Sequence, residues 1–313
     1  MEYMGTTFPE GRDRRTARPK DLQRVPWRVS FPGLYTKGGR VNPAVHLRGV
    51  DISFAVPGKP PFRAVSGAEL VVRPGEFVSI VGPTGCGKST LLNAAAGLLK
   101  PSAGDVQIEG RALEGLNARA GYLFQSDALM PWKTAGDNVA IGLEVAGTPR
   151  REALARAHEW LIRVGLRGFA DRYPHMLSGG QRKRVALAQV LIRDPDILLM
   201  DEPFGPLDAQ TRLIMHELLL RLWSQDRKAV LFVTHDLEEA IALSDRVVIM
   251  STGPEARIIG DFPIPLERPR DIAEIKLTPE FLRLHRDIWH LLKEQVMQAY
   301  GLQPEGTDSR GQA

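Results

Sequence analysis

The chain has 313 residues, of which 43% are hydrophobic and 25% charged, and its formal net charge is +4. This length allows one large or two ordinary domains, and the composition is typical of a soluble globular protein. The longest apolar runs, such as residues 229–233, are as long as a strand and far shorter than the roughly 20 residues that a membrane span needs. The only cysteine, Cys86, excludes an intramolecular disulfide and a cysteine-based metal cluster.

The basic charge is concentrated at the start of the chain. Residues 1–45 carry a surplus of +5, and the remaining chain carries −1. This extension is rich in Arg, Pro and Gly and lacks periodicity, so we predict a disordered basic tail. We favour a solvated tail over contact with an anionic membrane surface, contact with nucleic acid, or a misassigned start codon. The first residues lack the basic and apolar segments of a secretory signal, which predicts a cytoplasmic protein, and we expect no nucleic-acid partner.

Strand and helix patterns follow from Val45 onward. Alternating residues and turn signals predict a strand at 46–54, a loop at 57–61, and a strand at 68–72 that ends in a turn at 73–75. Apolar runs predict further strands at 76–81, 105–110, 120–124, 196–201, 228–234 and 246–250, with a candidate hairpin strand at 258–259. Helical spacing predicts helices at 91–96, 150–164, 177–192, 237–243 and 279–297.

This order of elements predicts an α/β fold. We expect a mixed, mainly parallel sheet flanked by helices, with an antiparallel β part and a helical insert at about residues 126–185. Residues 256–313 are predicted to form a hairpin and a helix, with a disordered end from Gln303. One face of that helix is expected to pack through Phe281, Leu284, Ile288, Leu291 and Leu292.

The stretch 82–90 fits the P-loop pattern of Gly, four residues, then Gly-Lys-Ser/Thr. It lies between a predicted strand and a predicted helix, so its backbone N–H groups and the positive end of the helix dipole would meet the phosphates. Lys88 would add a charge near the β- and γ-phosphates, Ser89 would offer its hydroxyl to magnesium, and Cys86 would pack. The predicted phosphate-binding residues are Gly82, Pro83, Thr84, Gly85, Cys86, Gly87, Lys88, Ser89 and Thr90.

Two further stretches suit phosphoryl transfer. The apolar strand 197–201 ends in Asp201 and Glu202, of which the first suits the magnesium shell and the second can activate a water molecule. Ser178, Gly179 and Gly180 open a predicted helix and form a second phosphate-binding surface. Because one chain needs only one such surface, the second predicts a nucleotide held between two copies of the chain.

Together with the Gln125 segment and His235, these motifs resemble the ATP-binding subunit of ABC transporters over about residues 46–255. The resemblance implies a P-loop NTPase core that uses ATP and Mg²⁺. It implies that Gln125 senses magnesium and the attacking water, that Asp208 lies at the dimer seam, and that His235 contacts the γ-phosphate. At the position of Pro206 the family usually has a small residue. Pro206 is expected to stiffen the loop that carries Asp208.

One adenine contact stays open. Phe54 falls where the family usually stacks an aromatic ring on adenine, and Phe62 is a rival for that role because the intervening loop is long.

Residues 126–134, 137–139 and 266–271 resemble the importer subfamily for nitrate, sulfonates and taurine. This implies a peripheral protein on the cytoplasmic face of the inner membrane, whose head-to-tail homodimer powers import of a small solute. A separate permease would dock near Gln125–Trp132, where Leu129, Met130 and Trp132 either receive it or pack the insert. A periplasmic or surface solute-binding protein would take part indirectly.

Four other interpretations remain. A soluble ABC ATPase of DNA repair or translation would bring a coiled-coil insert or tandem modules, which the sequence lacks. A different P-loop enzyme would leave residues 177–182 unexplained. A non-catalytic regulator is expected to lose Lys88, Glu202 or His235, and an importer of another substrate class stays open.

Overall fold

The computed structural model of the protein describes residues 35–36, 39–40 and 42–301. Chain contacts divide the protein into two units, residues 1–31 and residues 32–313. The first unit lies outside the described residues, as do most of the predicted tail at 1–45 and the predicted disordered end from Gln303. Within the tail, β1 (Tyr35–Thr36) and β2 (Gly39–Arg40) form a short antiparallel pair.

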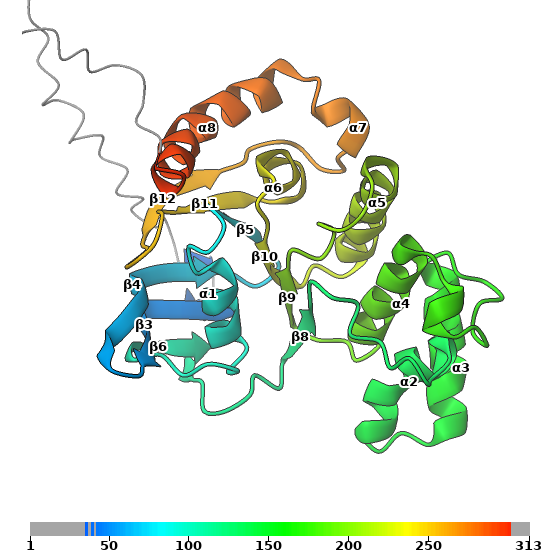
Figure 1. Ribbon diagram of the computed structural model, residues 1–313. Helices are drawn as coiled ribbons and strands as arrows, with labels where there is room; N and C mark the ends of the chain where they lie inside the picture. The colour runs from blue at the N-terminus through cyan, green and yellow to red at the C-terminus, as the bar shows by residue number, and fades with distance from the viewer. Residues whose placement is uncertain (1–34, 37–38, 41, 302–313) are drawn as a thin grey trace, which may run out of the picture. The chain divides into compact units, whose positions relative to one another are not determined.

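An antiparallel sheet comes first among the larger elements, with the strand order β4-β3-β6-β7 (Figure 1). Its strands are β3 (Val45–Val56), β4 (Lys59–Val72), β6 (Ala103–Ile108) and β7 (Arg111–Ala112). The predicted loop at 57–61 is too long, because residues 59–61 already belong to β4 and only residues 57–58 form the turn. Pro57 and Gly58 are the two central residues of the turn, and Gly58 has a φ of 71°, which a type II turn requires at its second central residue.

A six-stranded sheet carries the other predicted strands, in the order β12-β11-β5-β10-β9-β8. All pairs are parallel except β11 with β12. The strands are β5 (Phe77–Val81), β8 (Ala120–Leu123), β9 (Ile197–Asp201), β10 (Ala229–Val233), β11 (Arg246–Met250) and β12 (Ile258–Pro263). Every residue of β5, β10 and β11 is buried, as expected for strands covered on both faces.

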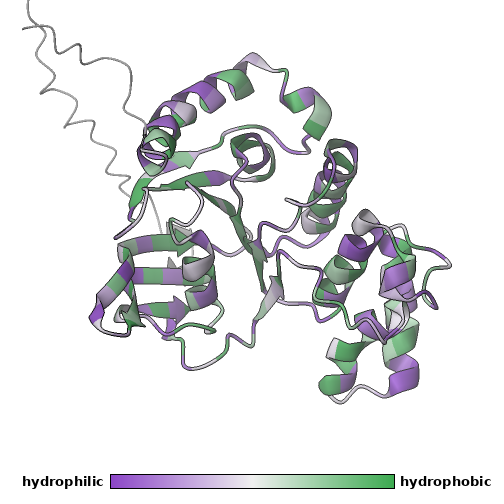
Figure 2. Cartoon of the chain, in the orientation of Figure 1, coloured by the Kyte–Doolittle hydropathy of each residue, from purple (hydrophilic) through white to green (hydrophobic). Residues whose placement is uncertain are grey.

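Alternate residues of these strands enter two separate hydrophobic cores. Val78 and Ile80 face a core shared with α1 (Lys88–Ala95) and the antiparallel sheet. Phe77 and Phe232 face the other core, whose helices include α5 (Ala209–Gln225) and α6 (Leu237–Leu243). Figure 2 shows the apolar strands between these layers. Because a strand alternates its side chains, each buried strand serves both cores at once.

Helices between β8 and β9 form the insert. They are α2 (Ala135–Val145), α3 (Arg150–Arg163), the short 3₁₀ helix η2 (Pro174–Met176) and α4 (Gly179–Leu191). Buried Val139, Leu161 and Val185 pack these helices together. The sequence predicted α3 and α4, whereas α2 and the long α5 were not predicted.

The C-terminal elements pack onto the core that contains Phe77 and Phe232. The predicted hairpin strand is β12, and α7 (Ile272–Ile275) and α8 (Pro279–Ala299) follow it. The predicted face of α8 is confirmed, since Phe281, Ile288 and Leu292 are buried and Leu284 and Leu291 pack beside them. Among the described residues, no helix is both long enough and apolar enough to span a bilayer.

Arg270 fastens this C-terminal segment to the sheet layer. Its Nη1 donates to the carbonyl oxygens of Ala242 and Ser244 at 3.0 and 2.8 Å, at the end of α6, and its Nη2 donates to that of Leu266 at 2.9 Å. Burial and the neighbouring Arg268 charge lower the pKa of Arg270 to about 10, so it remains charged at neutral pH. A cation at a helix C-terminus satisfies carbonyls that have no partner within the helix.

Replacing this arginine is expected to destabilise the fold. Arg270→Ala leaves several buried carbonyls without donors, so we expect the free energy of unfolding to fall by about 3 kcal/mol, measured by urea denaturation. Arg283→Ala is the control, because Arg283 is exposed on α8 and has no hydrogen bond or ion pair among the described residues. A loss below about 1 kcal/mol for Arg270→Ala would contradict this role.

Candidate nucleotide site

The P-loop lies between β5 and α1, as its sequence predicts. Two of its glycines are required by close packing. A Cβ on Gly87 would lie 2.8 Å from Val65 Cγ2, and a Cβ on Gly82 would lie 2.9 Å from both Cys86 Sγ and the Met250 carbonyl oxygen. Gly87 also has a φ of 98° at the N-cap of α1. No side chain caps this helix and its first turn has no acidic residue, so the N-terminal amides can receive an anion.

Lys88 lies folded into the loop. Its Nζ donates to the carbonyl oxygens of Gly82 and Pro83 at 2.9 and 3.0 Å, and the side chain is buried. A positive charge thus lies beside the α1 amides. This set of donors fits the phosphates of a nucleotide.

Asp201 links the P-loop helix to the end of β9. Its Oδ1 accepts from Ser89 Oγ at 2.7 Å. The Tyr122 hydroxyl lies 3.5 Å from Asp201 Oδ2 and donates to Asn93 Oδ1 at 2.9 Å. Burial raises the pKa of Asp201, with a further contribution from the Glu202 charge, whereas the Ser89 hydrogen bond opposes that rise. A hydroxyl and a carboxylate side by side are ligands that suit Mg²⁺.

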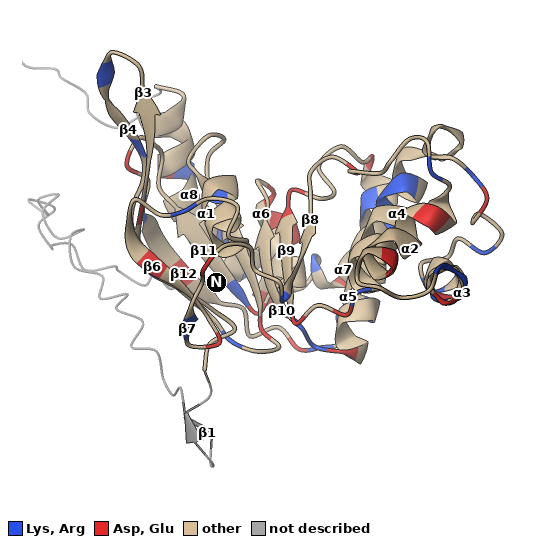
Figure 3. Ribbon diagram, turned by 90° about the horizontal axis from the view of Figure 1, so that it is seen from below, with Lys and Arg blue, Asp and Glu red and all other residues tan. Residues whose placement is uncertain are grey.

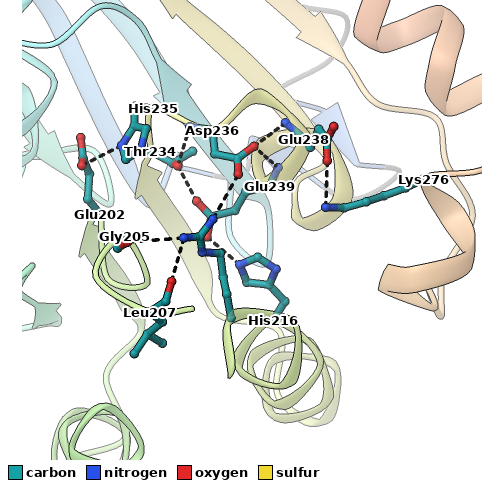
Figure 4. A network of polar contacts seen from close by, with 11 residues as sticks. Glu202, Gly205, Leu207, His216, Thr234, His235, Asp236, Glu238, Glu239 and Lys276 are labelled. Carbon is teal, nitrogen blue, oxygen red and sulfur yellow. Dashed lines mark hydrogen bonds and ion pairs between the residues drawn. The ribbon is translucent and has the colours of Figure 1, made fainter. Parts of the chain in front are cut away.

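Glu202 and His235 form a direct pair across neighbouring strand ends (Figure 4). His235 Nδ1 lies 2.9 Å from Glu202 Oε2, and the Glu202 amide donates to the Val233 carbonyl oxygen at 2.9 Å. Glu202 has a φ of 41°, in the left-handed region that non-glycine residues rarely adopt. The backbone therefore holds this carboxylate in a strained conformation beside the histidine.

A buried network supports the residue before His235 (Figure 4). The Thr234 hydroxyl donates to one Glu239 carboxylate oxygen, and the other lies 2.6 Å from His216 Nε2. The Asp236 amide donates to Thr234 Oγ1 at 3.0 Å. These contacts tie the end of β10 to α5 and α6, and so fix the backbone that carries His235.

The Ser178 turn lies elsewhere in the chain. Ser178 caps α4 and forms a capping box with Gln181, while Gly180 approaches α5 so closely that a Cβ would lie 2.5 Å from Thr211. Figures 1 and 3 show α1 and α4 on opposite sides of β8 and β9. Among the described residues, no hydrogen bond or ion pair joins residues 178–180 to the P-loop, Asp201, Glu202 or His235.

Asp208 caps α5, next to this turn. Its Oδ1 accepts from the Thr211 amide at 2.9 Å, which is the main reason that its pKa is lowered. The side chain is exposed, and it lies two residues after Pro206 at the surface.

Among the described residues, three predicted ones make no hydrogen bond or ion pair with the P-loop, Asp201, Glu202 or His235. Gln125 is exposed, and its carbonyl oxygen accepts from Lys183 Nζ at 3.0 Å. Phe54 and Phe62 are paired directly across β3 and β4, and both rings are exposed. The two rivals for the adenine contact therefore lie side by side on one hairpin.

Several polar residues around the site were not predicted from the sequence: Asn93, Tyr122, Asp127, Lys183, His216 and Glu239. One of them, Lys183, could have been noticed in the sequence. It lies one turn into a largely apolar helix, and a lysine on an apolar helix face is rare.

Comparisons with known proteins identify the family. A sequence profile for the ABC transporter family matches residues 65–205. An uncharacterized ABC transporter ATP-binding protein of Methanocaldococcus jannaschii is 46% identical over 237 residues, which cover 76% of this chain and 87% of that protein. The taurine import ATP-binding protein TauB of Pseudomonas aeruginosa is 49% identical over 216 residues, covering 68% and 82%.

The chain belongs to the ATP-binding subunits of ABC transporters, in the nitrate, sulfonate and taurine importer family. Among solved structures, a dimeric bacterial ABC transporter cassette is 33% identical with a TM-score of 0.64 and covers 71% of this chain and 100% of the cassette. The predicted α/β P-loop NTPase fold is confirmed, and the protein is an ABC-type ATPase.

Cys86 gives a direct probe of the P-loop in this ATPase. Its side chain is 1% exposed, and burial raises the pKa of its thiol, so little reactive thiolate is available. We expect 5,5′-dithiobis(2-nitrobenzoate) to modify the native protein more than about tenfold more slowly than the urea-unfolded chain. Equal rates would contradict the burial of Cys86, and because it is the only cysteine the signal has one source.

Proposed function

We propose that two copies of this chain close head to tail around two ATP molecules and that hydrolysis drives import of a small solute through a separate permease. The observation that carries this proposal is the division of the phosphate-binding residues within one chain. Lys88, Ser89, Asp201, Glu202 and His235 gather at one edge of the sheet, while the Ser178 turn lies apart from them. A second copy would supply the missing turn, and the similar cassette of known structure is dimeric.

Glu202 is the proposed general base. Its carboxylate would take a proton from the attacking water, and His235 would hold that carboxylate in position and contact the γ-phosphate. Lys88 would stabilise the charge that develops on the transferred phosphoryl group.

Mg²⁺ fits the Ser89 and Asp201 oxygens, which lie 2.7 Å apart, and Gln125 would complete its surroundings. When bound, the ion would neutralise charge on the phosphates. Phe54 and Phe62 together would provide an aromatic surface for adenine.

At the dimer seam, Ser178, Gly179 and Gly180 of each copy would meet the γ-phosphate held by the other. Asp208 caps α5, whose Thr211 lies against Gly180, and would form part of the same seam.

The permease is proposed to dock at the start of the insert. A cavity of about 400 Å³ lies between β8 and the insert, lined in part by Phe124, Ala128 and Ile141. Trp132 is 73% exposed and is available for contact, whereas Leu129 packs against the core. Docking near Gln125–Trp132 would connect the permease to a residue of the ATP site.

The solute is proposed to be taurine, nitrate, a sulfonate or a similar small anion. The importer relatives named for taurine support this class, including TauB of Escherichia coli K12, which is 42% identical over 242 residues. In this arrangement the protein works at the cytoplasmic face of the inner membrane, and a periplasmic or surface solute-binding protein delivers the solute to the permease.

Removing the proposed base should separate binding from hydrolysis. Glu202→Gln keeps the size of the side chain but loses basicity, so we expect MgATP binding to persist and hydrolysis to fall by about a hundredfold or more. Equilibrium binding, phosphate release and light scattering would be measured on the same sample, with a dimer expected in MgATP.

Glu217→Gln is the matched control, because Glu217 is an exposed carboxylate on α5 with no hydrogen bond or ion pair among the described residues. It should hydrolyse ATP at the normal rate. Near-normal turnover by Glu202→Gln would remove Glu202 from its role.

The docking surface has its own test. Trp132→Ala should weaken co-purification with the permease while ATP hydrolysis by the isolated subunit stays within about twofold, since Trp132 is exposed and lies outside the phosphate site. Trp289→Ala on α8 is the control, because it removes the same ring from a position that is 40% exposed. Undiminished assembly by Trp132→Ala would exclude this residue from the interface.

A further inference from the structure

Lys183 is a charged residue in the interior of the insert. Its side chain is 2% exposed, and it lies four residues after Gly179 on α4. Its Nζ donates to the Gln125 carbonyl oxygen at 3.0 Å and to the Phe124 carbonyl oxygen at 3.4 Å, and lies 3.2 Å from Asp127 Oδ1. The ammonium therefore binds the backbone of the segment that carries Gln125.

Asp127 extends this contact to the Ser178 turn. Its other oxygen, Oδ2, accepts from Arg182 Nε at 2.9 Å, and Arg182 Nη1 donates to the Leu177 carbonyl oxygen at 2.8 Å. The chain of contacts thus runs from Gln125 through Lys183, Asp127 and Arg182 to Leu177. Figure 3 shows the basic residues of α4 in blue. We call these four contacting residues, Gln125, Asp127, Arg182 and Lys183, the insert clamp.

Packing alone does not account for an ammonium group at this position. Burial lowers the pKa of Lys183, and the Asp127 carboxylate opposes that change. Replacing a buried ion pair by apolar residues of similar size is often neutral or stabilising. The other buried side chains of α4, such as Val185, Leu187 and Leu191, are apolar. What the lysine adds over an apolar residue is a directed bond to two carbonyl oxygens of the Gln125 segment.

We propose that Lys183 is a positioning residue for ATP hydrolysis, which holds the Gln125 backbone to the helix that begins at the Ser178 turn. The inference rests on the proposed head-to-tail dimer, in which the two ends of the clamp serve different nucleotides. Gln125 faces the ATP of its own chain, and Gly179 faces the ATP of the other copy. When the ATP of the other copy binds at Gly179, the insert clamp moves Gln125 together with α4. The occupancy of one nucleotide site therefore affects the position of Gln125 in the other.

The first test changes the lysine in the full-length chain. Lys183→Met keeps the apolar stem and removes the three donors, whereas Lys183→Gln keeps N–H donors for the carbonyl oxygens. For Lys183→Met we expect kcat for ATP to fall about tenfold with KM within about twofold, because Gln125 is misplaced and the phosphate contacts remain. Lys183→Gln should recover kcat to within about threefold of the unchanged protein.

The second readout is hydrogen–deuterium exchange of residues 124–128 without nucleotide. Lys183→Met should exchange faster in this segment, while β5 and β10 keep their protection. Because no nucleotide is present, this result stands apart from the proposed function. If the dimer mechanism were wrong, the exchange would still change, but the ATPase activity per molecule of the unchanged protein would not rise with protein concentration.

Lys293→Met is the matched control, because Lys293 is exposed on α8 and has no hydrogen bond or ion pair among the described residues. Folded Lys183→Met with unchanged exchange at 124–128, or with unchanged kcat, would overturn the proposal, and so would a lowered melting temperature as the sole effect. If Lys183→Met fails to fold, Asp127→Asn is measured in its place. Unchanged exchange and kcat in that variant would overturn the clamp equally.

Discussion

The parallel register of three central strands is the constraint on which the site depends. In β10, Val233 pairs with Ile80 of β5 on one side and with Asp201 of β9 on the other. The strands therefore end at the same level, and the P-loop, the two carboxylates and His235 follow at one edge of the sheet. Carboxyl ends of parallel strands are where α/β proteins bind ligands. The Ser89 hydrogen bond to Asp201 and the contact of Glu202 with His235 both follow from this register.

The place of the insert at one end of the sheet separates the Ser178 turn from the P-loop of the same chain. The Ser178 turn begins α4 in the insert between β8 and β9, and β8 is the edge strand of the sheet. The turn is held by its own capping box and by close contact with α5, away from the P-loop. The proposed dimer follows from this separation, because the Ser178 turn of one copy would complete the phosphate pocket of the other.

Most strands and the short motifs of the site could be predicted from the sequence, because the patterns that indicate them are local. Buried strands such as β9 and β10 appear in the sequence as uninterrupted apolar runs, and the P-loop and the Ser178 turn are short motifs at helix starts. The long α5 escaped prediction because leucines at successive positions hide its periodicity. The short turn at 57–58 escaped because two prolines after Gly58 suggest a loop.

The contacts that position the site residues could not be predicted from the sequence, for a different reason. Asp127 and Lys183 are 56 positions apart, and His216 and Glu239 meet only because α5 and α6 cover the same face. Such pairs depend on tertiary packing, which no local pattern encodes. They also connect separate motifs through hydrogen bonds and ion pairs.

The central claim is that each nucleotide pocket is built from two copies of the chain. The most direct measurement is the specific ATPase activity of the purified protein over a wide range of protein concentration, with the molecular mass followed by light scattering. A shared pocket predicts that activity per molecule rises with concentration as dimers form in MgATP. Constant activity per molecule at concentrations where the protein is a strict monomer would contradict the claim.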